Sequence, residues 1–161
     1  MNQKIKIAVA LGANLGDRKK TILAAINRMK EDFLEKAQES SLIETEPWGI
    51  IDQPKFLNGV IVGMSAWKPP AILNYLKNLE REFGRNESIL NGPRVLDLDL
   101  ICYGDQIWNS DRLQVPHPRI ATRNFVLIPL MQVWPDWVHP VLQKNVGQLL
   151  ASVESGVVVP I

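Results

Sequence analysis

Two carboxylates stand inside an otherwise apolar segment near the middle of the 161-residue chain. Residues 92–101 run Gly-Pro-Arg-Val-Leu-Asp-Leu-Asp-Leu-Ile, a pattern typical of a buried β-strand apart from its two aspartates. Because side chains alternate along a strand, Asp97 and Asp99 share one face about 6.6 Å apart, while the leucines before, between and after them share the other. One face therefore belongs to the core, and the other is available for chemistry.

The chemistry that suits two neighbouring carboxylates is cation binding. Like charges on a half-buried surface repel and aspartate does not favour strands, so local propensity disfavours this segment unless a cation is present. Mg²⁺ takes one or two carboxylates and completes its octahedron with waters and substrate phosphates. Arg94, three residues before Asp97, adds a guanidinium that can grip a phosphate oxygen. The alternative is that Asp97 and Asp99 face water, paired with Arg94, and this spacing also occurs in other Mg²⁺ and Mn²⁺ enzymes.

A group of basic side chains follows the acidic segment. His117 lies between two prolines in a Val-Pro-His-Pro-Arg turn, and Arg112, Arg119 and Arg123 are close to it in the sequence. If this group faces the aspartates, it forms a clamp for a polyphosphate. The alternative is that the histidine is structural and that some of the arginines, Arg119 above all, are merely solvated.

A polar amide interrupts a second apolar strand pattern. Within residues 56–64, Asn58 shares a face with Phe56 and Val60. A buried amide needs hydrogen-bond partners, which either a heterocyclic ligand or the neighbouring backbone can supply. The glycine-rich segment 12–16 precedes a helix but lacks the spacing of a phosphate-binding loop, so we interpret it mainly as a turn.

The elements that must position these side chains follow from hydrophobic periodicity. The predicted strands cover residues 5–11, 40–45, 56–64, the acidic segment up to residue 101, and 106–108, and the predicted helices cover residues 17–33, 69–83, 122–133 and 146–153. Pro129 should kink the third helix. The order indicates an α+β fold with a ferredoxin-like βαββαβ core, in which both helices cover one face of an antiparallel sheet, followed by a C-terminal hairpin and helical extension.

Length and composition indicate a single domain over residues 1–161. Lys and Arg total 18 against 17 Asp and Glu, so a net charge of +1 gives no overall field to attract nucleic acid or an anionic membrane. The single cysteine, Cys102, excludes an internal disulfide. The N-terminal residues lack the apolar core of a secretory leader, and no stretch approaches about 18 apolar residues. We therefore expect a cytoplasmic monomer that binds small molecules rather than nucleic acid or membranes.

Six segments, in the same order along the chain, carry a resemblance to a known family. They are Leu11-Gly-x-Asn14-Leu-Gly16, Glu44-Thr45-x-Pro47, Gln53-Pro54-x-Phe56-Leu57-Asn58, Gly92-Pro93-Arg94-x-x-Asp97-Leu98-Asp99-Leu100-Ile101, Val115-Pro116-His117-Pro118 and Arg123-x-Phe125-Val126-Leu127-x-Pro129-Leu130. With these segments the chain closely resembles the hydroxymethyldihydropterin pyrophosphokinase family of folate biosynthesis. The likeness covers nearly the whole chain, and the fourth segment is its most specific part.

The resemblance implies transfer of pyrophosphate from ATP to the hydroxymethyl group of 6-hydroxymethyl-7,8-dihydropterin, with attack on the β-phosphorus and release of AMP. It implies that Asp97 and Asp99 hold two Mg²⁺ ions, which bridge the triphosphate and the pterin hydroxyl. The residues implied at the pterin are two stacking rings, Phe56 and Phe125, and two polar groups, Thr45 and Asn58. The residues implied at the ATP phosphates are Arg85, Arg94, Arg112, His117 and Arg123. The catalytic set implied is Asp97, Asp99, Arg94 and His117.

The sequence also departs from the family pattern. Residues 86–91 lack the basic and aromatic side chains that some members carry there, and Phe56 stands where tyrosine is common. Because Mg²⁺ acidifies the attacking hydroxyl, a general base is not required, and whether His117 acts as one is left open. No second catalytic domain follows, so we expect a stand-alone enzyme. Two other functions stay open: another Mg²⁺-dependent transferase or phosphohydrolase, and a non-catalytic ferredoxin-like module that binds a small ligand.

Overall fold

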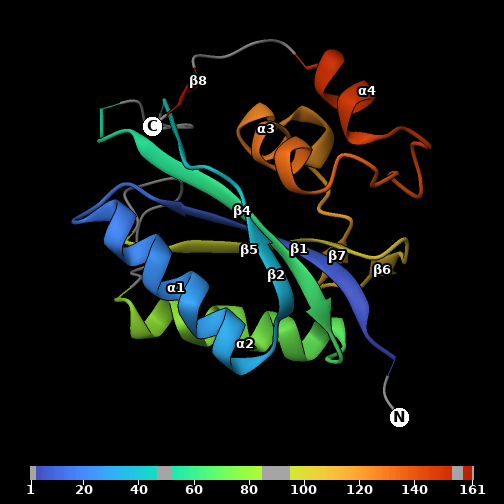
Figure 1. The fold of residues 1–161 in the computed structure, drawn as a ribbon, viewed down its shortest axis with the longest axis horizontal. Coiled ribbons are helices and arrows are strands. Elements are labelled where there is room, and N and C mark those ends of the chain that lie inside the picture. The colour runs from blue at the N-terminus through green and yellow to red at the C-terminus, as the bar shows by residue number, and fades with distance from the viewer. Residues whose placement is uncertain (1–2, 47–51, 85–94, 154–157, 161) are drawn as a thin grey trace.

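An antiparallel sheet with helices on both faces forms the core of the computed structural model (Figure 1). The structure describes residues 3–46, 52–84, 95–153 and 158–160. The strands are β1 (Ile5–Ala13), β2 (Glu35–Glu39), β3 (Ile43–Thr45), β4 (Phe56–Ser65), β5 (Asp97–Tyr103), β6 (Trp108–Asn109), β7 (Gln114–Val115) and β8 (Val158–Pro160). The helices are α1 (Arg18–Asp32), α2 (Pro69–Glu82), the 3-10 helix η1 (Ile120–Thr122), α3 (Asn124–Val133) and α4 (Val146–Ala151).

The main sheet has β1 and β4 among its interior strands. Among the described residues its strand order is β5-β1-β4-β3-β8, with β2 also paired to β4, while β6 and β7 form a separate pair. All pairs in the main sheet are antiparallel. The order β1-α1-(β2, β3)-β4-α2-β5 is the predicted βαββαβ core, with its second strand divided in two. The predicted ferredoxin-like α+β class is confirmed.

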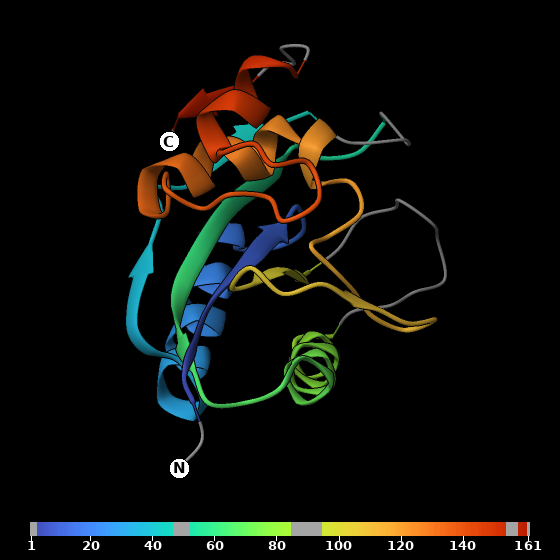
Figure 2. The ribbon, with the colours of Figure 1, turned by 90° about the vertical axis from the view of Figure 1, so that its right-hand side faces the viewer.

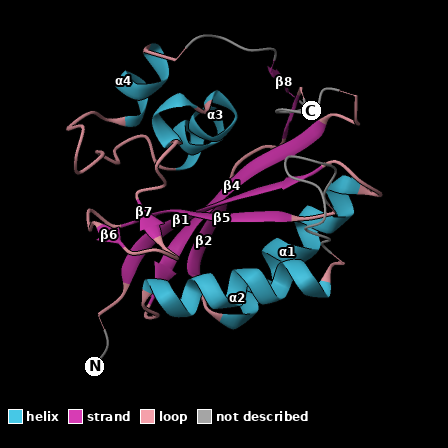
Figure 3. Cartoon of the chain, turned by 180° about the vertical axis from the view of Figure 1, so that it is seen from behind, coloured by secondary structure: helices cyan, strands magenta, loops and turns pink. Residues whose placement is uncertain are grey.

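Helices α1 and α2 cover one face of the sheet, whereas α3 and α4 cover the other, as the opposite views of Figures 1 and 3 show. Side chains alternate accordingly along β1. Ile7, Val9 and Leu11 pack with the buried side of α1 and α2, while Ala8 belongs to a second apolar cluster with α3 and α4. Because both faces are covered, the central strands are apolar on both sides except where the site lies.

The helix ends follow the sequence signals. The side chain of Asp17 accepts the backbone N–H of Lys20 at 3.2 Å and so caps α1. Helix α2 begins at Pro69, and Gly84, just beyond its end, has a φ of +86° that favours glycine. Pro129, the proline expected to kink the third helix, lies inside α3, which continues past it to Val133.

Three short elements differ from the prediction. Residues 35–39 form the additional strand β2, whose mostly exposed Glu-Lys-Ala-Gln-Glu sequence has no apolar alternation to signal it. The strand predicted at residues 106–108 overlaps β6, but β6 pairs with β7 rather than with β5, and a single bridge joins Tyr103 to Gln106. The strand β8, which was not predicted, pairs with β3.

Strand β5 forms an edge of the main sheet. The view in Figure 2 looks along α2 and shows it on one side of the sheet, with the segment that leads into α3 on the other. The face of β5 that looks away from α1 and α2 is therefore covered by the chain around η1 and α3. None of the helices in the described part of the chain is both long and apolar enough to cross a membrane.

Candidate active site

A cavity of about 300 Å³ opens on the face of the sheet that α3 covers. Strands β1, β3, β4 and β5 provide its floor, and the turn before η1 and the start of α3 provide its opposite wall. Most of the predicted site residues line it: Thr45, Phe56, Asn58, Asp97, Asp99, His117, Arg123 and Phe125. Arg85 and Arg94 lie outside the described residues. Arg112 is exposed between β6 and β7, and the described lining of the cavity does not include it.

The acidic wall consists of Asp97 and Asp99 on β5. The ladder pairs them with Gly12 and Ala10 of β1, so both carboxylates leave the same face of the sheet, as the alternation predicts. Burial and, next, the charge of Asp97 raise the pKa of Asp99 to about 7. The pair fits a hard cation such as Mg²⁺, which needs few protein ligands. The described residues contain no group of three or more His, Cys, Asp or Glu that could hold a metal ion.

Arg123 lines the cavity from the N-terminal end of α3. Its positive charge opposes the rise in the pKa of Asp99, which places the guanidinium within electrostatic reach of the acidic wall. Its Cζ lies 5.5 Å from the centre of the Phe125 ring, and its Nε is buried without a hydrogen-bond partner among the described residues. A buried guanidinium donor in this situation suits an anionic oxygen of a ligand.

His117 is a neutral imidazole with one favoured tautomer. Its Nδ1 accepts the backbone N–H of Arg119 at 3.1 Å, and its own backbone N–H donates to the carbonyl of Ile101 at 2.8 Å. Burial, followed by the charges of Arg123 and Arg119, lowers the pKa of His117 to about 4. Because Nδ1 is the acceptor, the ring proton resides on Nε2. The side chain can therefore donate a hydrogen bond to an anion, whereas a general base would need a free nitrogen lone pair.

The other end of the cavity is uncharged and partly aromatic. Asn58 Nδ2 donates to Thr45 Oγ1 at 2.6 Å, and both residues are buried. The amide thus finds a partner on the neighbouring strand, through a side chain rather than the backbone. A Cβ on Gly12 would approach Asn58 Oδ1 to 2.9 Å, so this glycine keeps the space beside that oxygen free. With Phe56 and Phe125 in the same lining, this end suits a flat heterocycle with a polar edge.

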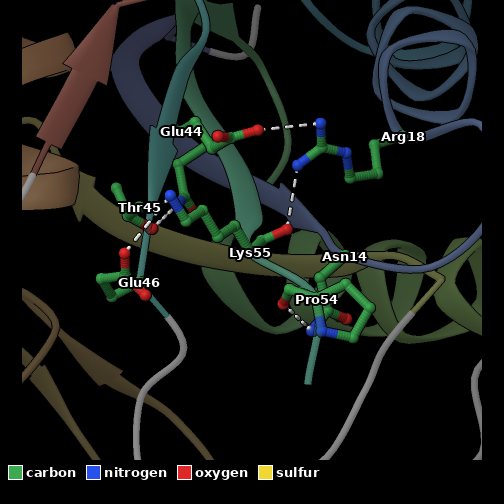
Figure 4. Close-up of polar contacts among 8 residues, drawn as sticks. Asn14, Arg18, Glu44, Thr45, Glu46, Pro54 and Lys55 are labelled. Carbon is green, nitrogen blue, oxygen red and sulfur yellow. Dashed lines mark hydrogen bonds and ion pairs between the residues drawn. The ribbon is translucent and has the colours of Figure 1, made fainter. Parts of the chain in front are cut away.

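A hydrogen-bonded clamp holds the segment that leads into Phe56 (Figure 4). Asn14, which is 2% exposed in the turn between β1 and α1, supplies the donor. Its Nδ2 donates to Gln53 Oε1 at 2.8 Å and to the carbonyl of Pro54 at 2.9 Å. The turn that we interpreted from the sequence as mainly structural therefore supports one wall of the cavity.

Arg18 extends this clamp to β3 (Figure 4). Its guanidinium donates to the carbonyl of Lys55 at 2.9 Å and forms an ion pair with Glu44 at 3.0 Å. Glu44 immediately precedes Thr45, and Lys55 immediately precedes Phe56. Arg18 at the start of α1 thus links Glu44 to Lys55, the residues directly before the cavity residues Thr45 and Phe56.

Sequence reasoning missed two residues of α2. Lys77 reaches the cavity past the edge strand β5, and Glu80 Oε2 accepts the backbone N–H of Leu98 at 2.8 Å. Glu80 follows Ile72 and Leu76 at four-residue intervals, so an acidic residue occupies the buried stripe of the helix. That conflict with the pattern is a signal that could have identified Glu80, whereas Lys77 carries no such signal.

Fold and cavity together define a ferredoxin-like α+β domain with a polar ligand pocket on its sheet, in which carboxylates and a guanidinium line the same space. Residues 8–135 match the family model described as 7,8-dihydro-6-hydroxymethylpterin-pyrophosphokinase. The chain belongs to this family, and the resemblance noted in the sequence is confirmed.

Several curated relatives support this assignment. The 2-amino-4-hydroxy-6-hydroxymethyldihydropteridine pyrophosphokinase of Aquifex aeolicus (strain VF5) is 37% identical over 138 residues, which are 86% of this chain and 86% of that protein. The folate synthesis bifunctional protein of Arabidopsis thaliana is 44% identical over 129 residues, 80% of this chain and 27% of the relative. The folic acid synthesis protein fol1 of Pneumocystis carinii is 39% identical over 91% of this chain and 20% of the relative. The chain thus spans only about a fifth to a quarter of the two longer relatives.

Solved structures support the fold. The crystal structure of wild-type Plasmodium falciparum HPPK-DHPS with pteroate superposes with a TM-score of 0.74 at 16% identity, over 94% of this chain and 42% of that one. A structure of HPPK-DHPS in complex with substrates also gives 0.74, at 15% identity, over 93% of this chain and 43% of that one. At such low identity the likeness concerns the arrangement of helices and strands.

Proposed function

We propose that the chain transfers pyrophosphate from ATP to the hydroxymethyl group of 6-hydroxymethyl-7,8-dihydropterin, giving the pterin diphosphate and AMP in folate biosynthesis. The observation that carries the proposal is one cavity in which Asp97 and Asp99 lie near Arg123, and which continues to the buried amide of Asn58. One end suits a triphosphate with its cation, and the other suits a polar heterocycle. Family membership supports the identity of both substrates.

Asp97 and Asp99 are the residues that would hold Mg²⁺, and we propose two ions. Bound Mg²⁺ neutralises the triphosphate and lowers the pKa of the attacking hydroxyl. The carboxylates share one face of an edge strand, which leaves the remaining coordination positions to water and to phosphate oxygens. The raised pKa of Asp99 means that cation binding at neutral pH displaces a proton from this carboxyl.

Arg123 and His117 bind the triphosphate in this proposal. The buried Nε of Arg123 donates to a phosphate oxygen, and the Nε2–H of His117 adds a donor without a net charge. Lys77 contributes a positive charge from the other side of β5. Transfer of phosphoryl groups depends mainly on positioning and on neutralising charge, which these side chains provide. The resemblance adds three further residues at the phosphates: Arg85, Arg94 and Arg112.

The pterin lies between Phe56 and Phe125 in this proposal, with Asn58 and Thr45 at its polar edge. Its hydroxymethyl oxygen forms a bond to the β-phosphorus of ATP. The bond between that phosphorus and the oxygen bridging to the α-phosphorus breaks, so AMP departs with the bridging oxygen, and the hydroxyl proton passes to water. Since His117 already carries its proton on Nε2, it acts as a hydrogen-bond donor rather than as the base.

A product assay tests the proposal. The purified protein is incubated with Mg²⁺ and ATP, with and without the hydroxymethyl dihydropterin, and the nucleotides are separated by chromatography. We expect AMP only when the pterin is present. Asp97→Asn and Asp99→Asn should each lower the rate by roughly a thousandfold, whereas the control Asp111→Asn, in an exposed connection, should not. ADP as the product, or AMP formed equally without the pterin, would contradict the proposal.

A single domain over residues 1–161, a monomeric state and a cytoplasmic location stay predictions. Light scattering coupled to size-exclusion chromatography tests the second of these. We expect a mass close to the 18.2 kDa of one chain, and a mass near twice that value would contradict the prediction.

A further inference from the structure

Glu80 is a buried carboxylate on the side of α2 that packs against the sheet. It is 1% exposed, and within the described parts of the chain no other Asp or Glu is as fully buried. Burying a carboxylate costs free energy unless its charge and its lone pairs find partners. The residues one and two turns earlier, Leu76 and Ile72, belong to the apolar core, so an aliphatic side chain could pack here without that cost. Packing alone therefore does not account for an acid at this position.

One partner of Glu80 is the backbone between the two aspartates of the cavity. Its Oε2 accepts the N–H of Leu98 at 2.8 Å. Leu98 belongs to the edge strand β5, which pairs with β1 on one side only within the described sheet. An outward N–H on such an edge has no strand to pair with. Because Asp97 and Asp99 directly flank Leu98, the Glu80 carboxylate fixes the stretch of backbone that carries both.

Lys77 connects the same carboxylate to the cavity. Its Nζ lies 3.8 Å from Glu80 Oε1, within one turn of α2, and the lysine contributes to the cavity lining. The two oxygens of Glu80 thus contact the backbone of the acidic strand and a cation at the rim of the anion site. Through Glu80, helix α2 on the opposite face of the sheet therefore contacts both the strand that carries the acidic residues and the basic side chain of Lys77.

We propose that Glu80 is a positioning residue for the metal site: by holding the N–H of Leu98, it fixes the relative placement of the Asp97 and Asp99 carboxylates. The inference rests on the proposed function for the identity of the cation as Mg²⁺. A cation shared by two carboxylates requires them to be held within about 0.5 Å of the productive geometry. An edge strand bonded on one side only is freer to twist, and the hydrogen bond from Leu98 to Glu80 restrains it on the open side.

Three variants separate positioning from packing. Glu80→Gln keeps an acceptor for Leu98 N–H, and Glu80→Leu removes it. Glu82→Leu is the matched control, because Glu82 lies on the same helix, is exposed and pairs with Arg28 at 2.7 Å. The probe is Mn²⁺, measured by electron paramagnetic resonance with the protein and a non-hydrolysable ATP analogue. Binding of the analogue in EDTA and the melting temperature in EDTA are measured alongside.

We expect Glu80→Leu to weaken Mn²⁺ binding by about tenfold or more, within the range seen when outer-shell partners of metal ligands are removed. Glu80→Gln should stay within about threefold of the parent protein, since its acceptor is retained. The control should bind Mn²⁺ unchanged, and the binding of the analogue in EDTA should be the same for all variants. If Glu80→Leu does not fold, Glu80→Asp, which is one methylene too short to reach Leu98, replaces it with the same expectation.

Unchanged Mn²⁺ binding in a destabilised Glu80→Leu protein would overturn the proposal, because Glu80 would then be only a partner for the strand edge. Equal weakening in Glu80→Gln and Glu80→Leu would also overturn it, since the charge rather than the hydrogen bond would be responsible. The Mn²⁺ comparison does not need turnover. If the parent protein fails to form AMP with the pterin, the proposed function is contradicted. The Mn²⁺ measurements still decide whether Glu80 positions the two aspartates.

Discussion

Asp97 and Asn58 pair with the same residue, Gly12, from the two sides of β1. Because neighbouring strands lie about 4.8 Å apart, the two residues are separated by roughly 10 Å across the sheet. The cation side and the heterocycle side of the cavity therefore share one row of the sheet, with a residue that lacks a side chain between them. In the proposed function, this row would place the residues that hold the two substrates on one floor of a single cavity.

Gly12→Ala should damage pterin binding more than ATP binding. A Cβ at this position would meet Asn58 Oδ1 at 2.9 Å and lie 3.9 Å from the Phe56 ring. Overpacking of this kind costs about 1–3 kcal/mol, which corresponds to a rise in the KM for the pterin of roughly 5- to 150-fold. Steady-state kinetics with each substrate varied in turn measures the effect.

Gly147→Ala is the matched control for this substitution. Its Cβ would have only ordinary van der Waals neighbours, the nearest at 3.5 Å, and it lies on α4 outside the cavity lining. We expect unchanged KM values for both substrates. Equal increases in the two KM values of Gly12→Ala would argue against the placement of the pterin beside Asn58.

Phe125→Ala should weaken binding of the pterin while binding of ATP changes less. Stacking of a base on an aromatic ring contributes about 1–3 kcal/mol, so the dissociation constant of the pterin should rise roughly 5- to 150-fold. Arg123, whose guanidinium lies over the same ring, is the N-cap residue of α3 and is retained in this variant. Calorimetric titration with each ligand measures both constants, and equal losses for the two ligands would refute the stacking role.

His117→Gln should lower kcat/KM for ATP by about 10- to 100-fold, the loss expected for one hydrogen bond to a charged group. The pH profile should keep its shape between pH 5.5 and about 8, because the low pKa of His117, about 4, keeps the imidazole neutral throughout this range. A profile from which the variant removes an inflection near pH 6.5 would instead indicate that this histidine exchanges a proton in the reaction.

Binding of Mg²⁺ should strengthen as the pH rises toward neutrality. The pKa of Asp99 is raised to about 7, so below this value the metal-free carboxyl holds a proton that the cation must displace. The apparent affinity should therefore increase by up to tenfold per pH unit below pH 7 and level off above it. Titration of the protein with Mg²⁺ and an ATP analogue at pH 6 and at pH 8 checks this dependence, and equal affinities at the two values would contradict it.

The free energy of unfolding of the metal-free protein should depend on pH through two groups with opposite effects. Folding raises the pKa of Asp99, so the folded protein binds more protons than the unfolded one, and this contribution falls as the pH rises from about 4 to 7. Folding lowers the pKa of His117, so its contribution rises with pH from about 4 to 6.5. In Asp99→Asn only the His117 contribution remains, so the free energy of unfolding should rise with pH. In His117→Gln only the Asp99 contribution remains, so the free energy of unfolding should fall with pH. Urea unfolding in EDTA at pH 5 and pH 7 measures both slopes, and identical slopes in the two variants would exclude this origin.

Local patterns in the sequence predicted much of the fold and the charged part of the site. Alternation places Asp97 and Asp99 on one face of β5, and it places Asn58 on the cavity face of β4, because a strand leaves its side chains no other directions. The polar strand β2 has no such alternation, since its residues lie on the surface at the side of the sheet. The periodicity of α2 shows only which side is buried, and not that Lys77 extends past the edge of β5.

Long-range contacts account for the rest of what sequence reasoning could not supply. Asn14 and Gln53 are 39 residues apart in the chain, and their hydrogen bond exists only because β1 and β4 are neighbours in the sheet. The bond from Leu98 to Glu80 likewise depends on where α2 crosses the edge strand. Each requires knowledge of the packed elements, because neither partner shows a local periodicity that points to the other.

The fate of isotopically labelled phosphorus tests the central claim most directly. ATP labelled at the β-phosphorus, and in a parallel reaction at the α-phosphorus, is incubated with the protein, Mg²⁺ and the hydroxymethyl dihydropterin. Attack on the β-phosphorus predicts that the β label is recovered in the pterin product and the α label in AMP. Recovery of the β label in ADP, with only the terminal phosphate transferred, would contradict the account.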